Sequence, residues 1–86
     1  MYKVVLTKES VKYYQKSNDK TKRLLNECFE DLKISPQSGI NVKRLHGELN
    51  GLHRYRVGSL RVIYKIEEEK VTVIIVTIGS RGDIYK

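Results

Sequence analysis

The spacing of apolar positions separates one strand and two helices in the first part of the chain. Residues 2–7 (YKVVLT) form a short run rich in β-branched side chains, which is typical of a strand. Residues 7–17 and 20–33 follow a helical spacing instead. Thr7 is the expected N-cap of the first helix, and Asn18 with Asp19 interrupts the pattern and can cap the second.

The second helix carries its apolar side chains in one stripe. Leu25, Cys28, Phe29 and Leu32 fall at positions i, i+3, i+4 and i+7, which places them on one helix face. Cys28 is the only cysteine, so the chain cannot form an internal disulfide or a zinc site built from cysteines. Because Cys28 lies on the apolar stripe and no histidine shares that face, we interpret it as a core residue rather than a nucleophile.

The second half of the chain predicts three strands. A loop at residues 35–41 contains the only proline and a glycine. Strand patterns follow at residues 52–57, 60–67 and 71–78, and EEEK supplies the last turn. The order is therefore strand, helix, helix and three strands, with no repeat or linker. A helical hairpin covering one face of a mostly antiparallel sheet satisfies this order, which predicts a single α+β two-layer domain over residues 1–86.

The predicted hairpin HRYRVGSLRVIYKI gathers like charges. A two-residue turn at Gly58 and Ser59 would place Arg56 directly opposite Arg61, with Arg54 on the same face. By alternation the opposite, helix-facing side would hold Tyr55, Val57, Leu60, Val62, Tyr64 and Ile66, whereas Ile63 and Lys65 would join the arginines. Like charges opposite each other destabilise a sheet, so this arrangement asks for an explanation.

The distribution of charge along the chain allows two interpretations of these arginines. The formal net charge is +7, which favours a polyanionic partner such as nucleic acid, an anionic membrane surface or an acidic protein. Residues 40–66 contain six Lys/Arg and a single acid, Glu48. In the first interpretation the arginines form a solvated face that keeps the protein soluble. A solubility face would normally mix signs, whereas guanidinium groups bind phosphate in a bidentate manner, so a phosphate-binding face is the sharper hypothesis.

Several classes of function are disfavoured. The chain has no N-terminal run of signal-peptide type and no stretch of 18 apolar residues, so we expect a soluble, cytoplasmic protein without a membrane partner. His46 and His53 are seven residues apart with only Glu48 between them, so a metal site is not expected. Gly47 and Gly51 match no nucleotide-binding fingerprint, and we expect no cofactor.

The segments RLHGELNGLHRYRVGSLRVIYKI and VTVIIVTIGSRGDIY resemble the RelE/ParE superfamily of bacterial and archaeal toxins. The family pattern is a lead-in with leucine and glycine, an arginine-rich hairpin, a hydrophobic strand, then Gly-x-Arg and a late tyrosine. The resemblance covers nearly the whole chain and implies a β-α-α-β-β-β fold. It also implies a cognate antitoxin that wraps the domain and masks its site.

The resemblance leaves the activity open between branches. RelE-type members cleave mRNA in the ribosomal A site, ParE-type members inhibit DNA gyrase on the same fold, and a homologue without catalysis would only bind RNA or its antitoxin. The late SRGDIY segment keeps both an arginine and a tyrosine, which favours the RelE branch and a metal-independent endoribonuclease. By motif, the cleavage site falls on Arg54, Arg56, Arg61, Arg81 and Tyr85.

The chemistry implied by the RelE branch is attack of a ribose 2′-hydroxyl on the neighbouring phosphate. Guanidinium groups would stabilise the charge that develops on phosphorus, while a base and an acid move protons. Arginine is a poor base near neutrality, and the hairpin positions that carry lysine in the best-known RelE toxins are arginine here. A histidine side chain has a suitable ordinary pKa for a base. His46 is therefore a possible base, although a histidine before a strand is more often a plain surface residue. Tyr85 would stack on a nucleobase or shuttle a proton. The expected RNA contacts outside this site are Lys43, Arg44 and Lys65.

Overall fold

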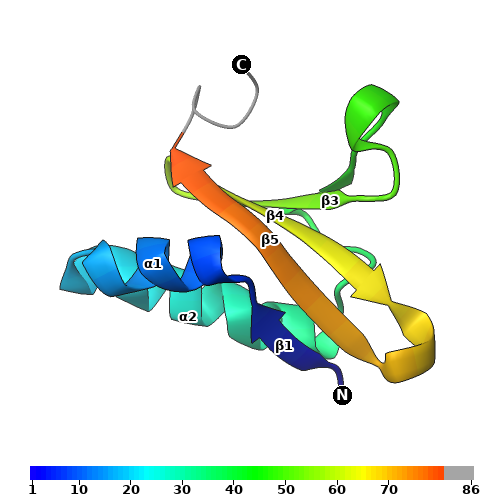
Figure 1. The fold of residues 1–86 in the computed structure, drawn as a ribbon, viewed down its shortest axis with the longest axis horizontal. Helices are drawn as coiled ribbons and strands as arrows, with labels where there is room; N and C mark the ends of the chain where they lie inside the picture. Colours follow the sequence, from blue (N-terminus) through cyan, green and yellow to red (C-terminus); the bar gives the residue numbers. More distant parts are fainter. Residues whose placement is uncertain (81–86) are drawn as a thin grey trace.

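The computed structural model describes residues 1–80, and it folds into a five-stranded sheet with two helices on one face (Figure 1). The helices are α1 (Lys8–Lys16) and α2 (Asp19–Ile34). The strands are β1 (Lys3–Leu6), β2 (Val42–Arg44), β3 (His53–Val57), β4 (Leu60–Glu67) and β5 (Thr72–Ser80). Short 3₁₀ turns at Gly47–Leu49 and Glu68–Lys70 connect β2 to β3 and β4 to β5.

The strand order is β1-β5-β4-β3-β2, with β1 parallel to β5 and every other pair antiparallel. A parallel pair needs a crossover connection, and the helical hairpin is part of that connection. The helices lie together below the sheet in Figure 1, so the other face is free of helices in the described chain. The predicted two-layer α+β fold is confirmed.

Two details of the sheet differ from the prediction. β2 was not predicted, because it is only three residues long and two of its residues are basic. The last strand begins at Thr72 rather than at Val71, and it continues to Ser80. Val71 instead adopts a left-handed conformation with φ 47° and ψ 48° and closes the turn from β4.

Both helices begin where capping residues were predicted. The Thr7 hydroxyl oxygen accepts a hydrogen bond from the Ser10 backbone N–H at 3.3 Å. The Asn18 side-chain oxygen accepts one from the Thr21 N–H at 2.8 Å. Each bond satisfies a donor that the first helical turn leaves without an intrahelical partner.

The core lies between α2 and the helix-facing side of the sheet. Leu25, Cys28 and Leu32 are fully buried, and Phe29 packs against this core while remaining half-buried. Burial raises the pKa of the Cys28 thiol well above its ordinary value. The interpretation of Cys28 as a core residue is therefore confirmed. From the sheet, the main buried contributors are Tyr55, Leu60, Val62, Tyr64, Val73, Ile75 and Ile78.

The hairpin between β3 and β4 has the predicted register. Val57 pairs with Leu60 and Arg56 pairs with Arg61 across a two-residue turn. Gly58 has φ 58°, and a tight hairpin turn requires a positive φ at its first central position. Glycine adopts this angle without steric cost because it has no Cβ. This register fixes which side chains of the hairpin face the helices and which face away from them.

No helix among residues 1–80 is long and apolar enough to cross a membrane.

Candidate nucleic-acid interface

The helix-free side of the sheet, called the open face below, carries two cross-strand rows of cationic residues. In the first row Lys43 pairs with Arg54, and Arg54 pairs with Ile63. In the second row Arg56 pairs with Arg61, whose partner on β5 is Gly79. Neighbouring strands are about 4.8 Å apart, so β2, β3 and β4 bring four cations together on one face.

Ile63 forms an apolar floor beneath this cluster. It is only 1% exposed, yet it does not belong to the core under the helices, and Leu45 is buried in the same way. Arg54 is the cross-strand neighbour of Ile63, and its Nε atom is buried without a hydrogen-bond partner in the described chain. A buried donor without an acceptor is unfavourable. Arg54 is thus held close to the sheet with a donor that an anionic oxygen would satisfy.

A shallow hollow of about 290 Å³ adjoins the hairpin turn, and Arg56, Gly58, Ser59 and Arg61 line it. Arg56 is exposed and Arg61 is half-buried. Two guanidinium groups from paired positions therefore border one space with the Ser59 residue. Such a space suits a phosphate group, because guanidinium donors bind its oxygens in a bidentate manner.

Three other predicted residues lie apart from this cluster. Arg44 pairs with His53 on the helix-facing side, opposite Lys43, so the two predicted RNA contacts on β2 point to different faces. Lys65 lies on the open face but is 3.9 Å from a Glu67 carboxylate oxygen. His46 is exposed and precedes the 3₁₀ turn at Gly47–Leu49. Arg81 and Tyr85 lie outside the described residues.

His53, the second histidine, belongs to the helix-facing side. Its ring stacks on the Tyr64 ring with centroids 5.4 Å apart. Burial lowers the pKa of His53, and the nearby Arg44 lowers it further. Since the open face lies on the other side of the sheet, His53 is not placed to take a proton from RNA bound there.

One polar contact at the border of the open face was not predicted. Thr77 pairs with Ile63 on β4, and its hydroxyl donates to a carboxylate oxygen of Glu9 from α1. The pairing of β4 with β5 shifts by one residue next to Ile63. As a result Ile75 and Ile78 both face the core, although strict alternation would place residues three apart on opposite faces. Strict alternation along the last strand gives no signal of such a shift.

No group of three or more His, Cys, Asp or Glu side chains within residues 1–80 is arranged to hold a metal ion.

Comparisons of this fold and sequence with known proteins identify the class of protein: toxins of type II toxin–antitoxin systems. The ParE toxin family of such systems (parDE) matches residues 6–85. Toxin RelG of Mycobacterium tuberculosis strain H37Rv is 41% identical over 60 residues, which cover 69% of this chain and 66% of that protein. The matched segment thus spans just under two thirds of that relative.

Solved structures agree with the sequence matches. The toxin–antitoxin complex RelBE2 of Mycobacterium tuberculosis matches with a TM-score of 0.82 and 28% identity over 93% of this chain and 98% of the matched chain. The archaeal RelE–RelB complex of Pyrococcus horikoshii matches with a TM-score of 0.79 and 29% identity over 95% and 97%. The chain belongs to the RelE/ParE superfamily of type II toxins.

Proposed function

We propose that this toxin is an endoribonuclease that cleaves mRNA on the ribosome and thereby inhibits translation. The observation that carries the proposal is the open face, where Arg54, Arg56 and Arg61 converge from two paired strands. The phosphate groups of a bound RNA backbone would relieve the repulsion between these side chains. Arg54 adds a buried donor that lacks an acceptor in the described chain. Similarity to proteins named RelE and RelG supports the same choice.

The proposed reaction is an internal transesterification of RNA. The ribose 2′-oxygen forms a bond to the adjacent phosphorus while the bond from phosphorus to the 5′-oxygen breaks. A base takes the 2′-hydroxyl proton, and an acid protonates the leaving 5′-oxygen, which yields a 2′,3′-cyclic phosphate and a 5′-hydroxyl end. Arginines at fixed positions stabilise the negative charge that grows on the phosphorane oxygens. No step in this scheme requires a metal ion.

The positions of the residues support a role for each of them. Arg56 and Arg61 border the phosphate-sized hollow and are assigned to the phosphorane. Arg54 and Lys43 would hold the flanking backbone. Arg81 and Tyr85 are assigned to the same site by the family pattern. His46 stays the candidate base, although its exposed position at the start of the 3₁₀ turn requires the RNA or the ribosome to approach it.

The proposed partners are mRNA, the ribosome and a cognate antitoxin, all in the cytoplasm. The similar structures RelBE2 and archaeal RelE–RelB are complexes of a toxin with an antitoxin, which supports an antitoxin for this chain. A masking partner fits the net charge of +7, since an acidic segment would cover the open face.

A second candidate function is inhibition of DNA gyrase, and the match to the ParE toxin family favours it. The two functions are separated by purified components. Incubation with translating ribosomes followed by primer extension should give discrete cleavage sites on the mRNA. A supercoiling assay with gyrase should show no inhibition. The opposite pair of results would establish the gyrase function, and two negative results would leave a homologue that only binds its partners.

A further inference from the structure

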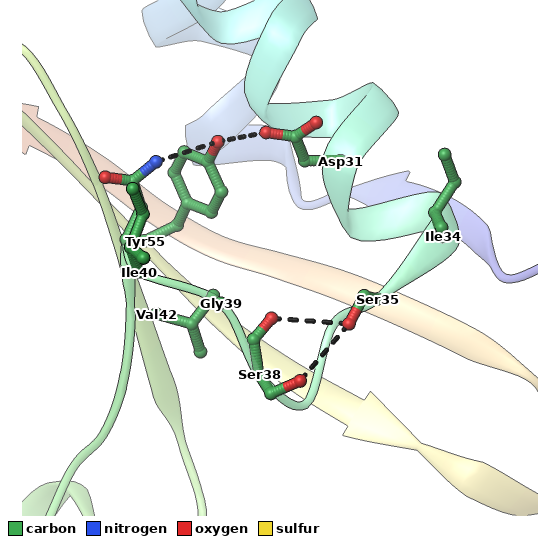
Figure 2. Close-up of a pocket in the computed structure, with 9 residues that line it drawn as sticks. Asp31, Ile34, Ser35, Ser38, Gly39, Ile40, Val42 and Tyr55 are labelled. Carbon is green, nitrogen blue, oxygen red and sulfur yellow. Dashed lines mark hydrogen bonds between the residues drawn. The ribbon is translucent and has the colours of Figure 1, made fainter.

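A second hollow lies on the helix-facing side of the sheet, where the C-terminal end of α2 meets the edge strand β2 (Figure 2). Its volume is about 320 Å³. The walls come from the last turn of α2, the loop that follows it, and the start of β2, and Tyr55 of β3 closes one side. The proposed reaction uses none of these residues.

The electrostatics of this hollow favour a cation. Asp31 is the only charged residue among the described residues that line it, in a chain whose net charge is +7. Tyr55 donates its hydroxyl hydrogen to one Asp31 oxygen, and Asn41 donates to the Tyr55 oxygen at 3.5 Å, as Figure 2 shows. The C-terminal end of a helix adds partial negative charge from its carbonyl groups. Within residues 1–80, Asp31 has no ion-pair partner.

The cations of the neighbourhood do not fill this role. Lys33 in the last turn of α2 is engaged with Glu30 at 2.7 Å. Tyr55 is held protonated, because burial and the hydrogen bond to Asp31 raise its pKa to about 12. The tyrosine therefore orients the carboxylate and leaves its charge in place. Asp31 is exposed, so a cation from outside the chain can reach its carboxylate.

The walls of the hollow suit an aliphatic stem. Ile34 is 72% exposed and Ile40 is fully exposed, and both line the hollow together with Val42. Figure 2 places Ile34 on the α2 side of the hollow and Ile40 on the β2 side. A lysine or arginine side chain combines an apolar stem with a charged head. It would cover the isoleucines with its methylene groups and place its head at the carboxylate.

The position of β2 connects this hollow to the open face. β2 is an edge strand, and its neighbouring residues Val42 and Lys43 point to opposite sides of the sheet. A polypeptide that crosses the β2 edge would meet the cationic open face on one side and Asp31 on the other. Acidic residues suit the first surface and a basic residue suits the second. The exposed Arg44 also lies on the helix-facing side of β2, so the basic residue has to sit in the Asp31 hollow itself.

We propose that the Asp31 hollow anchors a lysine or arginine side chain of the cognate antitoxin, at a segment that crosses the β2 edge. The inference rests on the antitoxin partner of the proposed function but not on RNA cleavage. It assigns Asp31 as the residue that recognises the charge and Tyr55 as the residue that positions it. Ile34, Ile40 and Val42 contact the stem.

The test measures the affinity of the chain for the small protein encoded beside its gene. Asp31→Asn keeps an oxygen that accepts from Tyr55 and removes the charge, so we expect the dissociation constant to rise at least tenfold. Glu27→Gln is the matched control, because Glu27 is another exposed acid on α2. It should leave the affinity within about twofold. RNA cleavage by Asp31→Asn should equal that of the unmodified chain.

A double-mutant cycle identifies the anchored side chain. Each lysine and arginine of that small protein is replaced by glutamine and tested against the unmodified chain and against Asp31→Asn. One replacement should weaken binding to the first and have little effect on the second. The proposal is overturned if Asp31→Asn binds normally, if Glu27→Gln loses as much affinity, or if the small protein does not bind the unmodified chain. It is also overturned if Asp31→Asn instead dissociates a dimer of this chain in sedimentation experiments.

The result of the antitoxin-binding test does not depend on whether the chain cleaves RNA. A chain that cleaves no RNA but loses antitoxin affinity through Asp31→Asn would disprove the proposed function and keep the anchor. A chain that cleaves RNA and binds its antitoxin without Asp31 would do the reverse.

Discussion

Arg56 and Arg61 lie directly opposite each other across the β3–β4 hairpin, so two cations share one cross-strand position. Such a pair costs stability when the site is empty. A bound anion between the two side chains would relieve this repulsion. The hairpin therefore places two like charges opposite each other where the proposed substrate binds.

Replacement of Arg56 by threonine should stabilise the free chain. Arg56→Thr removes the repulsion and introduces a residue that favours strands, so the free energy of unfolding should rise by roughly 0.2–1 kcal/mol. Urea unfolding measures this change. Lys65→Thr on the same face serves as the control, because Lys65 has Glu67 nearby and should gain less. A lower stability of Arg56→Thr would mean that Arg56 makes favourable contacts in the free chain.

RNA binding should depend steeply on salt, because each neutralised phosphate releases counterions. Arg54→Ala and Arg56→Ala should each lower the slope of log affinity against log salt concentration by about one unit. Arg44→Ala should leave the slope unchanged, since Arg44 faces the other side of the sheet. Filter binding or fluorescence anisotropy over a salt series provides the slopes. Equal slopes for all variants would show that Arg54 and Arg56 do not contact phosphate and only form a solvated face.

Cleavage should be more sensitive than binding to Arg61 and Arg81. If they stabilise the phosphorane, Arg61→Ala and Arg81→Ala should each slow single-turnover cleavage on ribosomes by about a hundredfold or more. RNA affinity should change much less, because the lost interaction forms in the transition state. Tyr85→Phe separates proton transfer from stacking by removing the hydroxyl alone. Undiminished cleavage by both arginine variants would contradict the nuclease assignment.

Val71 should be a site where substitution stabilises the chain. A β-branched residue at φ 47° carries a steric cost of about 1–2 kcal/mol that glycine does not. Val71→Gly should raise the free energy of unfolding by up to about 1 kcal/mol after the greater entropy of glycine in the unfolded chain is subtracted. Thermal and urea unfolding measure it. Val11→Gly, in the interior of α1, should destabilise the chain and so provides the contrasting control.

Stability should fall as the solution becomes alkaline. The pKa of Cys28 is raised by burial, and that of Tyr55 is raised to about 12 by burial and its bond to Asp31. Groups that are buried neutral contribute stability below their unfolded pKa and lose it as pH rises toward the folded value. The free energy of unfolding should therefore decline from about pH 9 upward. Cys28→Ala should have a lower free energy of unfolding at neutral pH, and that energy should decline less as the pH rises. An equal decline would mean that the Cys28 thiol does not contribute to the pH dependence.

Most of the fold could be predicted from the sequence because its signals are local. The apolar stripe from Leu25 to Leu32, the caps at Thr7 and Asn18, and the two-residue turn at Gly58 each determine structure within a few residues. The β2 strand could not be predicted, since three residues with two basic side chains carry no periodicity. Its pairing with β3 depends on a partner eleven residues further along, as in the pair Lys43 and Arg54.

The candidate site also has a part that local sequence signals predict and a part that depends on contacts between distant residues. Alternation placed Arg54, Arg56 and Arg61 on one face, because a fixed register determines the direction of every side chain. It did not separate Lys43 from Arg44, because without a predicted β2 no alternation applied to them. The Asp31–Tyr55 bond joins a helix to a strand 24 residues later, and the sequence pattern gives no sign of it.

The place of β5 in the sheet has a consequence for synthesis of the toxin. β5 is the last strand that the structure describes, yet it lies between β1 and β4, and Lys3 pairs with Thr72. The first strand therefore waits for a partner that is translated 69 residues later, the difference between positions 72 and 3. Until β5 has left the ribosome, the nascent chain holds an incomplete sheet with two strands unpaired on that side. We therefore expect a chain that stops before Thr72 to lack the strand that joins β1 to β4, and to leave this half of the sheet unformed.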